Sequence, residues 1–239
     1  MLGVPDDDAA AALERFHRPR ERFDFHLREL RTGALFRPAT RCAGGLEAGA
    51  GRGVEAVSWR RDSVRKIICV DMDEVIADAL GEHLLRYNRQ FSCNITVEDL
   101  HGHWLWDYVP EERQAALYDY LVSEDFFEVL GVMPEAQRVI EQLQERYEVF
   151  IATAAMEVPS SFNAKFKWLG KHFPFIRPSR IVFCGDKSIL HGDYLIDDNP
   201  RQLRLFRGEG ILFSSPANVG VSGFRRVNDW LDVEKMFLG

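Results

Sequence analysis

The sequence predicts an α/β fold, because short apolar runs alternate along the chain with segments of helical spacing. Runs of branched and aromatic residues that do not alternate with polar ones lie at residues 67–70, 147–153, 180–187 and 194–199. Such runs are typical of strands buried on both faces, as in parallel sheets covered by helices. We therefore expect a doubly wound, mostly parallel, Rossmann-like sheet, with a small helical cap inserted after the first core strand.

The first strand, Ile67 to Val70, is followed by two acids, Asp71 and Asp73, spaced one residue apart. In open α/β sheets ligands bind at the carboxyl ends of the strands, so two carboxylates there indicate a cation site or a reaction. A strand followed by a turn or a helix N-cap explains the pair equally well, because Asp favours both positions. The pair alone does not decide between these interpretations.

Each later strand also brings a polar group to its carboxyl end. Thr153 ends the second run, Lys187 follows the third, and Asp197 and Asp198 end the fourth. The carboxyl ends of parallel strands meet at one edge of the sheet, so these groups are expected to lie together. Four such coincidences are hard to produce by chance, and they favour a functional site.

The segment 79–131 is expected to form the cap, with the core made of 63–78 and 132–239. The cap segment is rich in aromatic residues, and Trp104 and Trp106 are candidates for contact with a planar ligand, although most aromatics at helical spacing pack in a core. His101 and His103 form a His-x-His pattern. We interpret it as a loop pair, because no third nitrogen or thiolate ligand lies nearby in sequence.

The remaining core elements follow from their patterns. Helices are expected at Ala77 to Asn88, at Pro134 to Arg146, at Ser161 to Phe173, after Asp198 and at Val227 to Phe237, with a short strand at Ile211 to Phe213. The helix at 161–173 carries Lys165, Lys167 and Lys171, half of the lysines of the chain. A lysine cluster usually marks a solvated face.

The composition limits the class of function. At 239 residues, 46% of them hydrophobic, the chain can bury one full core with an insert. The formal net charge of -7 argues against a nucleic-acid surface. A small phosphorylated ligand is compatible with it, since a local lysine and a metal can offset a negative field. No apolar stretch approaches a membrane span, and a homodimer is left open.

The four cysteines, Cys42, Cys69, Cys93 and Cys184, form no Cys-x-x-Cys pair. We expect buried thiols in a reducing, cytoplasmic environment rather than a disulfide framework or a zinc site. Residues 1–62 differ from the rest, because they are rich in arginine but lack lysine and contain a run of small residues at 43–53. We expect a disordered or poorly ordered extension without catalytic residues, in which Asp8 to Leu30 could form an isolated helix.

The order Asp-x-Asp, Thr, Lys, Asp-Asp resembles the four motifs of the haloacid dehalogenase-like phosphatases. Within that group the sequence resembles the 5'(3')-deoxyribonucleotidases, through DMDEVIAD at 71–78, FFEVLGVMPEA at 126–136, AKFKWLGKHF at 164–173 and DKSILHGDYLIDD at 186–198. The resemblance covers roughly residues 64–215. It implies a phosphomonoester hydrolase acting on a small molecule, a (deoxy)nucleoside monophosphate.

Such a reaction needs neutralised charge and a donated proton. We expect Asp71 to attack phosphorus and form an aspartyl-phosphate, and Asp73 to protonate the leaving group and then activate water. Oxygen-only ligands beside a phosphate favour Mg²⁺. The resemblance implies that its ligands are Asp71, the backbone carbonyl of Asp73 and Asp198, with Asp197 orienting a water or Lys187.

Two further roles follow from the resemblance. Thr153 and Lys187 are expected to bind the phosphoryl oxygens, the first by a hydrogen bond and the second as a point charge. Lys165 matches a lysine near the active site of the family. We therefore expect Lys165 to lie near the active site, unlike Lys167 and Lys171, which are expected on a solvated face.

The chain departs from the family pattern where the substrate is chosen, at Glu74, Ala79, Ala154, Ala155 and Glu157. These changes leave open a phosphatase of another small metabolite, such as a sugar phosphate. A dehalogenase is a further alternative, but its reaction does not need the second acid, Asp73. In a receiver-like domain the lysine follows all of the acids, whereas here Lys187 precedes Asp197 and Asp198. A non-catalytic phosphate-binding protein does not need a nucleophile and an acid together. All three are weaker alternatives.

Overall fold

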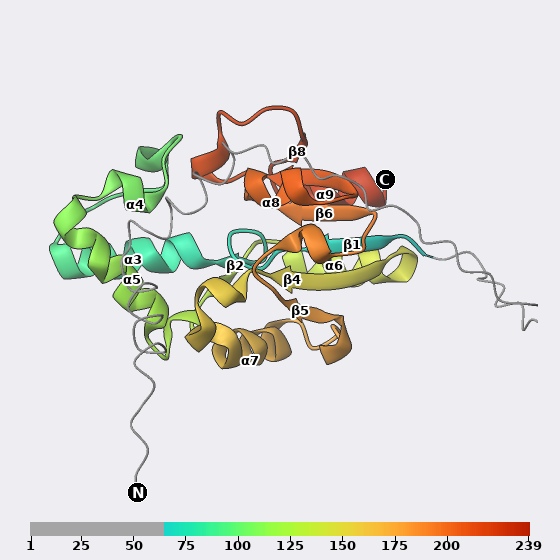
Figure 1. The fold of residues 1–239 in the computed structure, drawn as a ribbon, viewed down its shortest axis with the longest axis horizontal. Coiled ribbons are helices and arrows are strands. Elements are labelled where there is room, and N and C mark those ends of the chain that lie inside the picture. The colour runs from blue at the N-terminus through green and yellow to red at the C-terminus, as the bar shows by residue number, and fades with distance from the viewer. Residues whose placement is uncertain (1–64) are drawn as a thin grey trace, which may run out of the picture. The chain divides into compact units, whose positions relative to one another are not determined.

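A computed structural model describes residues 65–239, and its central element is a six-stranded sheet (Figure 1). The expectations for residues 1–62 and for Cys42 lie outside the described residues. Every pairing in the sheet is parallel, and the strand order is β5-β4-β1-β6-β7-β8. The strands are β1 (Ile67–Val70), β4 (Glu148–Thr153), β5 (Ile181–Phe183), β6 (Tyr194–Asp197), β7 (Glu209–Phe213) and β8 (Arg225–Val227). The predicted α/β fold is confirmed.

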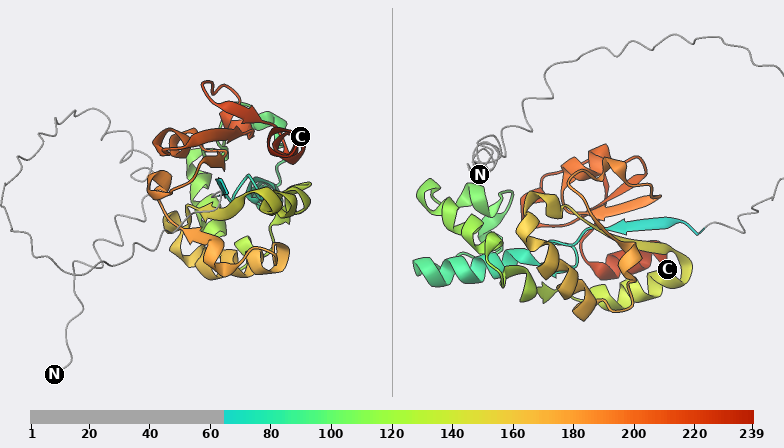
Figure 2. Two further views of the ribbon diagram at one scale, coloured as in Figure 1. Left: turned by 90° about the vertical axis from the view of Figure 1, so that its right-hand side faces the viewer. Right: turned by 60° about the horizontal axis from the view of Figure 1, so that its bottom comes forward.

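Helices cover both faces of the sheet (Figure 2). Alternate residues of a strand point to opposite faces, so Ile68 and Val70 join the larger core cluster, and Cys69 joins the smaller one. The larger cluster includes residues of α6 (Ala136–Arg146), α7 (Phe162–His172) and α9 (Trp230–Phe237), whereas the smaller one includes residues of α8 (Pro200–Leu205). The sheet therefore lies between two apolar layers.

The cap connects to the core through two paired segments. After β1 the chain turns into β2 (Ala77–Asp78), which pairs antiparallel with β3 (Gly131–Val132). Between them lie α3 (Ala79–Phe91), α4 (Leu105–Tyr108) and α5 (Gln114–Val122), which Figure 1 shows gathered to one side of the sheet. They pack around a third apolar cluster made of Leu84, Tyr87, Leu100, Leu105, Val109 and Leu117. β2 and β3 thus lie at the two ends of the predicted cap segment.

Local sequence explains where two helices beside the strand ends begin. The side chain of Asp78 accepts the N–H of Gly81 at the start of α3. Asn199 does the same for Arg201 at the start of α8, with Pro200 at the first helical position. These N-caps satisfy backbone donors that have no partner within the helix. One helix therefore starts at the stalk of the cap, and the other starts two residues after Asp198.

Some predicted boundaries were wrong. The expected closing helix 227–237 begins only at Trp230, and Val227 ends the strand β8, which the pattern did not predict. The expected helix at 77–88 begins at Ala79, because the two preceding residues pair with β3. Cys69 and Cys184 are buried free thiols as expected, but the free thiol of Cys93 is only half-buried.

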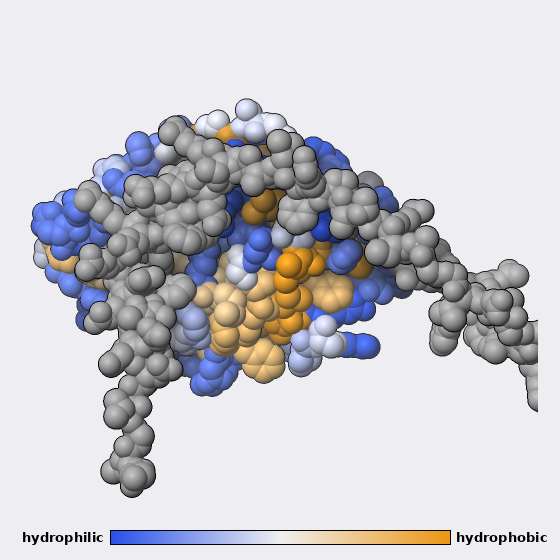
Figure 3. All heavy atoms as spheres, viewed as in Figure 1, coloured by the Kyte–Doolittle hydropathy of each residue, from blue (hydrophilic) through white to orange (hydrophobic). Residues whose placement is uncertain are grey.

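The edge of the sheet at β5 is partly uncovered within the described part of the chain. All three residues of β5 are partly exposed, and Figure 3 shows apolar side chains gathered on this side of the molecule. Between residues 65 and 239, no helix combines the length and the apolar character that crossing a bilayer requires.

Candidate active site

The carboxyl ends of three neighbouring strands and one adjoining turn deliver the polar groups of the site. Asp71 directly follows β1, Thr153 ends β4, and Asp197 ends β6. Lys187 lies four residues beyond β5, at the start of a short 3-10 turn (Lys187–Ile189). Because these strands are parallel neighbours, residues far apart in sequence meet at one edge of the sheet.

Lys187 is the charged centre of this cluster. Its ammonium group donates to Oδ1 of Asp71 at 2.5 Å and to Oδ2 of Asp197 at 2.6 Å, and the residue is only 1% exposed. Burial alone lowers the pKa of Lys187, but the two carboxylates outweigh burial and raise the pKa above its usual range. The side chain is therefore a permanent ammonium group between two acids.

The turn that carries Lys187 is fixed by Gln202 of α8. The side chain of Gln202 accepts the backbone N–H of Lys187 at 3.1 Å and donates to the carbonyl of Gly185 at 3.1 Å. Gln202 is buried, and its two hydrogen bonds hold the turn to α8.

The acids that end β6 differ in their partners. Both oxygens of Asp197 are occupied, because Oδ2 accepts from Lys187 and Oδ1 accepts from the backbone N–H of Asn199 at 2.8 Å. By contrast, Oδ2 of Asp198 is buried and has no hydrogen-bond partner in the described part of the chain. A buried acid oxygen without a partner is costly, and it indicates a group that pairs with something the protein binds.

Three carboxylates could hold a metal ion together. Oxygens of Asp71, Asp197 and Asp198 all lie within 4.8 Å of one another, and all three residues are buried. A set of oxygen ligands suits a hard divalent cation such as Mg²⁺, and the unpaired oxygen of Asp198 fits a ligand role. The structure therefore brings together three of the four aspartates that the sequence singled out, and the side chain of Asp73 is not in this group.

Burial and mutual repulsion perturb these acids. Burial, together with the charges of Asp197 and Asp73, raises the pKa of Asp71 to about 7 against the lowering effect of Lys187. Burial also raises the pKa of Asp198 well above its usual value, and the charges of Asp197 and Asp71 add to the effect. A bound cation relieves both causes, because it stabilises the ionised carboxylates.

Asp73 and Thr153 share a second buried cation, Lys165 of α7. The Lys165 ammonium donates to Oδ2 of Asp73 at 2.5 Å and to Oγ1 of Thr153 at 3.1 Å. It also lies 4.6 Å from the centre of the Phe127 ring. Lys165 is buried, whereas its neighbour Lys167 is exposed and pairs with Glu128. The structure therefore places Lys165 in the site and Lys167 on the solvated face.

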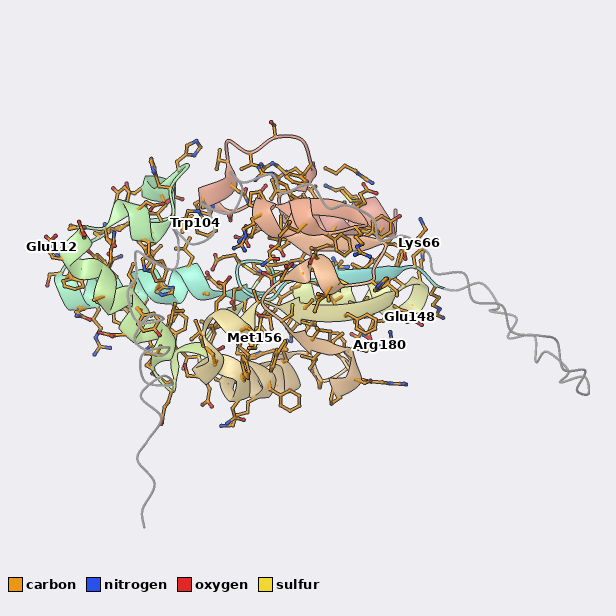
Figure 4. All side chains as sticks on the ribbon, viewed as in Figure 1. Lys66, Trp104, Glu112, Glu148, Met156 and Arg180 are labelled. Carbon is orange, nitrogen blue, oxygen red and sulfur yellow. The ribbon has the colours of Figure 1, made fainter. Side chains whose placement is uncertain are left out.

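A cavity of about 260 Å³ lies between the strand ends and the cap, and the four aspartates, Lys165 and Lys187 line it, whereas Thr153 is fully buried behind it. Trp104 and Trp106 line it, and Figure 4 shows Trp104 on the part of the cap that faces the core. The positions that depart from the family pattern also line it, namely Glu74, Ala79, Ala154, Ala155 and Glu157. His103 lines the cavity too. In residues 65–239 neither His101 nor His103 belongs to a group of side chains that could hold a metal.

Glu74 joins the strand-end loop to the cap. Its backbone has a φ of 62°, a conformation that favours glycine, and its Oε1 accepts the N–H of Leu80 in the first turn of α3 at 2.6 Å. Burial raises the pKa of Glu74 to about 8. The side chain therefore extends the cluster of acids to the stalk of the cap.

Sequence reasoning missed His83, which lies on α3 and lines the cavity. Its ring packs against Trp106 and Phe126, with centroid distances of 5.1 and 4.6 Å. Burial lowers the pKa of His83 to about 4, so it is neutral. A single histidine on an apolar helix face gives no sequence signal that separates a core residue from a wall of the site.

Comparison with known proteins now decides the family. A model of the family described as 5' nucleotidase, deoxy (pyrimidine), cytosolic type C protein matches residues 65–239. The chain belongs to this family. The deoxyribonucleotidase resemblance is thereby confirmed, and the chain is a phosphatase, a hydrolase of the nucleotidase type.

Curated relatives cover the same part of the chain. A Staphylococcus aureus protein named "Putative 5'(3')-deoxyribonucleotidase" is 48% identical over 174 residues, which are 73% of this chain and 96% of that protein. The 5'(3')-deoxyribonucleotidase of Bacillus subtilis is 35% identical over 176 residues, 73% of this chain and 100% of that protein. These relatives match this deoxyribonucleotidase family member along nearly their whole length.

A solved structure shows the same fold. A haloacid dehalogenase-like family hydrolase from Streptococcus pneumoniae matches with a TM-score of 0.50 and 10% identity, over 72% of this chain and 98% of that one. This likeness shows that the chain has a haloacid dehalogenase-like fold.

Proposed function

We propose that this phosphatase is a Mg²⁺-dependent 5'(3')-deoxyribonucleotidase that works through an aspartyl-phosphate. One observation carries the proposal. Carboxylate oxygens of Asp71, Asp197 and Asp198 lie within 4.8 Å of one another, beside the Lys187 ammonium, in a cavity that residues of the cap also line. Metal ligands, a nucleophile and a fixed positive charge are thus within reach of one phosphoryl group.

The cation site consists of the side chains of Asp71 and Asp198 and the backbone carbonyl of Asp73. Mg²⁺ neutralises charge on the carboxylates and on the phosphoryl oxygens when it is bound. Asp197 is not a ligand in this proposal, because Lys187 and Asn199 already occupy its two oxygens. It holds Lys187 in place.

Asp71 and Asp73 divide the chemistry. An oxygen of Asp71 attacks phosphorus in line, the bond from phosphorus to the ester oxygen breaks, and an aspartyl-phosphate forms. Asp73 gives a proton to the departing oxygen, and it then takes a proton from the water that hydrolyses the aspartyl-phosphate. This second step releases inorganic phosphate and restores Asp71.

Thr153 and Lys187 bind the phosphoryl oxygens. Oγ1 of Thr153 accepts from Lys165, so its own O–H is available to donate to phosphate. Lys187 has three N–H groups, and its two carboxylate partners leave one for the substrate. The two residues hold the phosphoryl group over Asp71.

The cap side of the cavity suits a nucleoside. The Trp104 side chain lines the cavity and is 41% exposed, so its ring is accessible to a base. Trp106 packs edge-on against His83 and builds the wall behind it. The names of the relatives support a deoxynucleoside monophosphate as substrate.

A second candidate is a phosphatase of another small metabolite. Ala79 and Glu157 line the cavity where the family offers an aromatic ring and can offer a lysine. A small side chain and a carboxylate there change both the shape and the charge that a substrate meets.

A panel of substrates tests the proposal. Phosphate release is measured with and without Mg²⁺ from deoxynucleoside, ribonucleoside and sugar monophosphates, with Asp71→Asn as the inactive control. We expect Mg²⁺-dependent release that is fastest from deoxynucleoside monophosphates. Preference for a sugar phosphate would move the protein to the second candidate, and turnover by Asp71→Asn would exclude Asp71 as the nucleophile.

A further inference from the structure

A hydrogen bond joins the cap to the core on one side of the cavity. The backbone N–H of Gly102, in the cap loop before α4, donates to the carbonyl of Pro216 at 2.9 Å. Pro216 begins a 3-10 turn (Pro216–Asn218) that follows β7. Trp104 and Pro216 both line the cavity. We call this hydrogen bond the cap latch, because it lies where the cap meets the core.

The same 3-10 turn is tied to the acid that ends β6. Asn218, the last residue of the turn, is 1% exposed. Its side-chain Nδ2 donates to the backbone carbonyl of Asp198 at 2.8 Å and to the carbonyl of Phe213 at 2.8 Å. The residue therefore links the end of β6 to the end of β7 and to the cap latch.

The other side of the Asn218 amide is occupied too. Its Oδ1 accepts from Nη1 of Arg226 at 2.8 Å and from the backbone N–H of Ser215 at 3.2 Å. Arg226 also donates from Nη2 to the carbonyls of Asn218 and Val221, at 2.9 and 2.8 Å. Reversing the amide sets its NH₂ against two donors, so the orientation of Asn218 is fixed by its partners. Both N–H groups and both acceptor positions of the buried Asn218 amide are thus occupied, which holds this side chain in one geometry.

We propose that Asn218 is a positioning residue that couples the carboxylate of Asp198 to the cap latch. The inference rests on the proposed function, because it assigns Asp198 to the metal. Asn218 holds the Asp198 carbonyl, and through it the direction in which the unpaired Oδ2 points. The same short turn carries the Pro216 carbonyl that receives the cap. A displacement of this turn therefore moves a metal ligand and releases the cap together.

The first test is Asn218→Asp, which is isosteric. The variant keeps an acceptor for Arg226 and Ser215, but it sets a carboxylate oxygen against the carbonyls of Asp198 and Phe213. Loss of a group that supports a metal ligand typically costs 10- to 100-fold in metal affinity or activity. We expect the Mg²⁺ concentration for half-maximal rate to rise about ten-fold, and excess Mg²⁺ to restore kcat but not KM.

A binding measurement accompanies the kinetics. The rise in melting temperature on adding Mg²⁺, without substrate, is compared between wild type and Asn218→Asp. We expect a smaller rise in the variant at the same Mg²⁺ concentration. If Asn218 has only a structural role, the variant melts lower than wild type by the same amount with and without Mg²⁺. Its Mg²⁺ requirement and its KM are then unchanged.

The cap latch offers a matched pair of variants at Gly102, whose side-chain position lies outside the hydrogen-bond network of Asn218. Gly102 has a φ of 83°, and a Cβ there meets no atom within 4 Å. Gly102→Ala disfavours this φ and weakens the latch, whereas Gly102→Asn tolerates positive φ and serves as the control. We expect Gly102→Ala to raise both KM and the Mg²⁺ requirement several-fold, and Gly102→Asn to stay near wild type.

These outcomes separate the inference from the proposed function. If wild type releases no phosphate from any ester with Mg²⁺, the proposed function fails, and the melting curves still test Asn218. If wild type is active but Asn218→Asp and Gly102→Ala both keep its Mg²⁺ requirement, the coupling is refuted. If Asn218→Asp does not fold, the Gly102 pair decides alone: a Mg²⁺ shift in the alanine variant supports the coupling, and no shift overturns it.

Discussion

The two walls of the cavity are built in different ways. On the core side, the charged groups are buried and bonded at fixed distances, as Lys187 is to Asp71 and Asp197. On the cap side, the wall is aromatic, and Trp104 keeps 41% of its surface exposed. A preorganised charged wall favours one chemistry, whereas an exposed ring tolerates different ligands.

From this contrast we infer that catalysis and substrate selection depend on different parts of the chain. The core wall comes from strand ends between two apolar layers, and sites built on packed strands and helices are positioned more precisely than sites on loops. The cap wall is connected to the core through the two-residue strands β2 and β3 and through the cap latch. We therefore expect changes to the core wall to abolish turnover and changes to the cap wall to alter KM.

The largest effect is expected for Lys187→Met. The variant leaves the buried acids Asp71 and Asp197 without their cation, which typically costs about 3–5 kcal/mol of unfolding free energy. Loss of the positive charge at the phosphoryl group also lowers kcat by about 10² to 10³. The control is Lys167→Met, whose exposed pair with Glu128 contributes about 1 kcal/mol or less. Equal effects of both substitutions in urea unfolding and in turnover would contradict the buried-charge argument.

A smaller and more selective effect separates the two acids at the end of β6. Asp198→Asn removes charge from the acid with the unpaired oxygen, so Mg²⁺ affinity falls by about 10- to 100-fold, as measured by calorimetric titration. Asp197→Asn instead weakens the hold on Lys187 and lowers kcat, with little change in Mg²⁺ affinity. If Asp197→Asn lowers the affinity more than Asp198→Asn, the two roles are reversed.

A third prediction uses the perturbed acids. Burial raises the pKa of Asp71 to about 7 and that of Glu74 to about 8, and it raises that of Asp198 as well, so the folded metal-free protein retains protons that the unfolded chain releases. Its stability therefore falls as pH rises toward 8. The pKa of His83 is lowered to about 4, so this residue makes stability rise with pH. It does so only below pH 6.5, which is the ordinary pKa of histidine.

The measurement compares a pH below these raised pKa values with a pH above them. Melting temperatures are compared at about pH 6.5 and pH 8.5, with a chelator and with Mg²⁺. We expect the metal-free protein to melt lower at pH 8.5, and the rise on adding Mg²⁺ to be larger there, because protons compete with the cation for the same oxygens. A Mg²⁺ effect of equal size at both pH values would show that these acids do not titrate in the site.

The sequence predicted the core wall better than the cap wall, for a physical reason. Asp71, Thr153, Lys187 and Asp198 each follow an apolar run, so the strand that positions them is visible in the residues beside them. The strand β8 was missed because Arg-Arg-Val contains no apolar run.

The roles that the sequence could not show arise from contacts between distant segments. Asn218 acts on Asp198, twenty residues away, and its neighbours in sequence indicate only a turn. His83 looks like any polar residue on a helix until α3 is packed beside Trp106. The backbone of Glu74 is another case, because its positive φ is a property of the folded loop.

The smallest effect is expected for Trp104→Ala on the cap wall. Stacking of a base on an aromatic ring is worth about 1–3 kcal/mol, so KM for a deoxynucleoside monophosphate rises by about ten-fold while kcat and the melting temperature change little. Deoxyribose 5-phosphate has no base, and its KM is expected to stay unchanged. Tyr108→Ala is the matched control, since Tyr108 is 44% exposed on α4 but does not line the cavity. An equal rise in KM for both esters would mean that Trp104 shapes the phosphate end of the site, and the division of labour between the two walls would then be wrong.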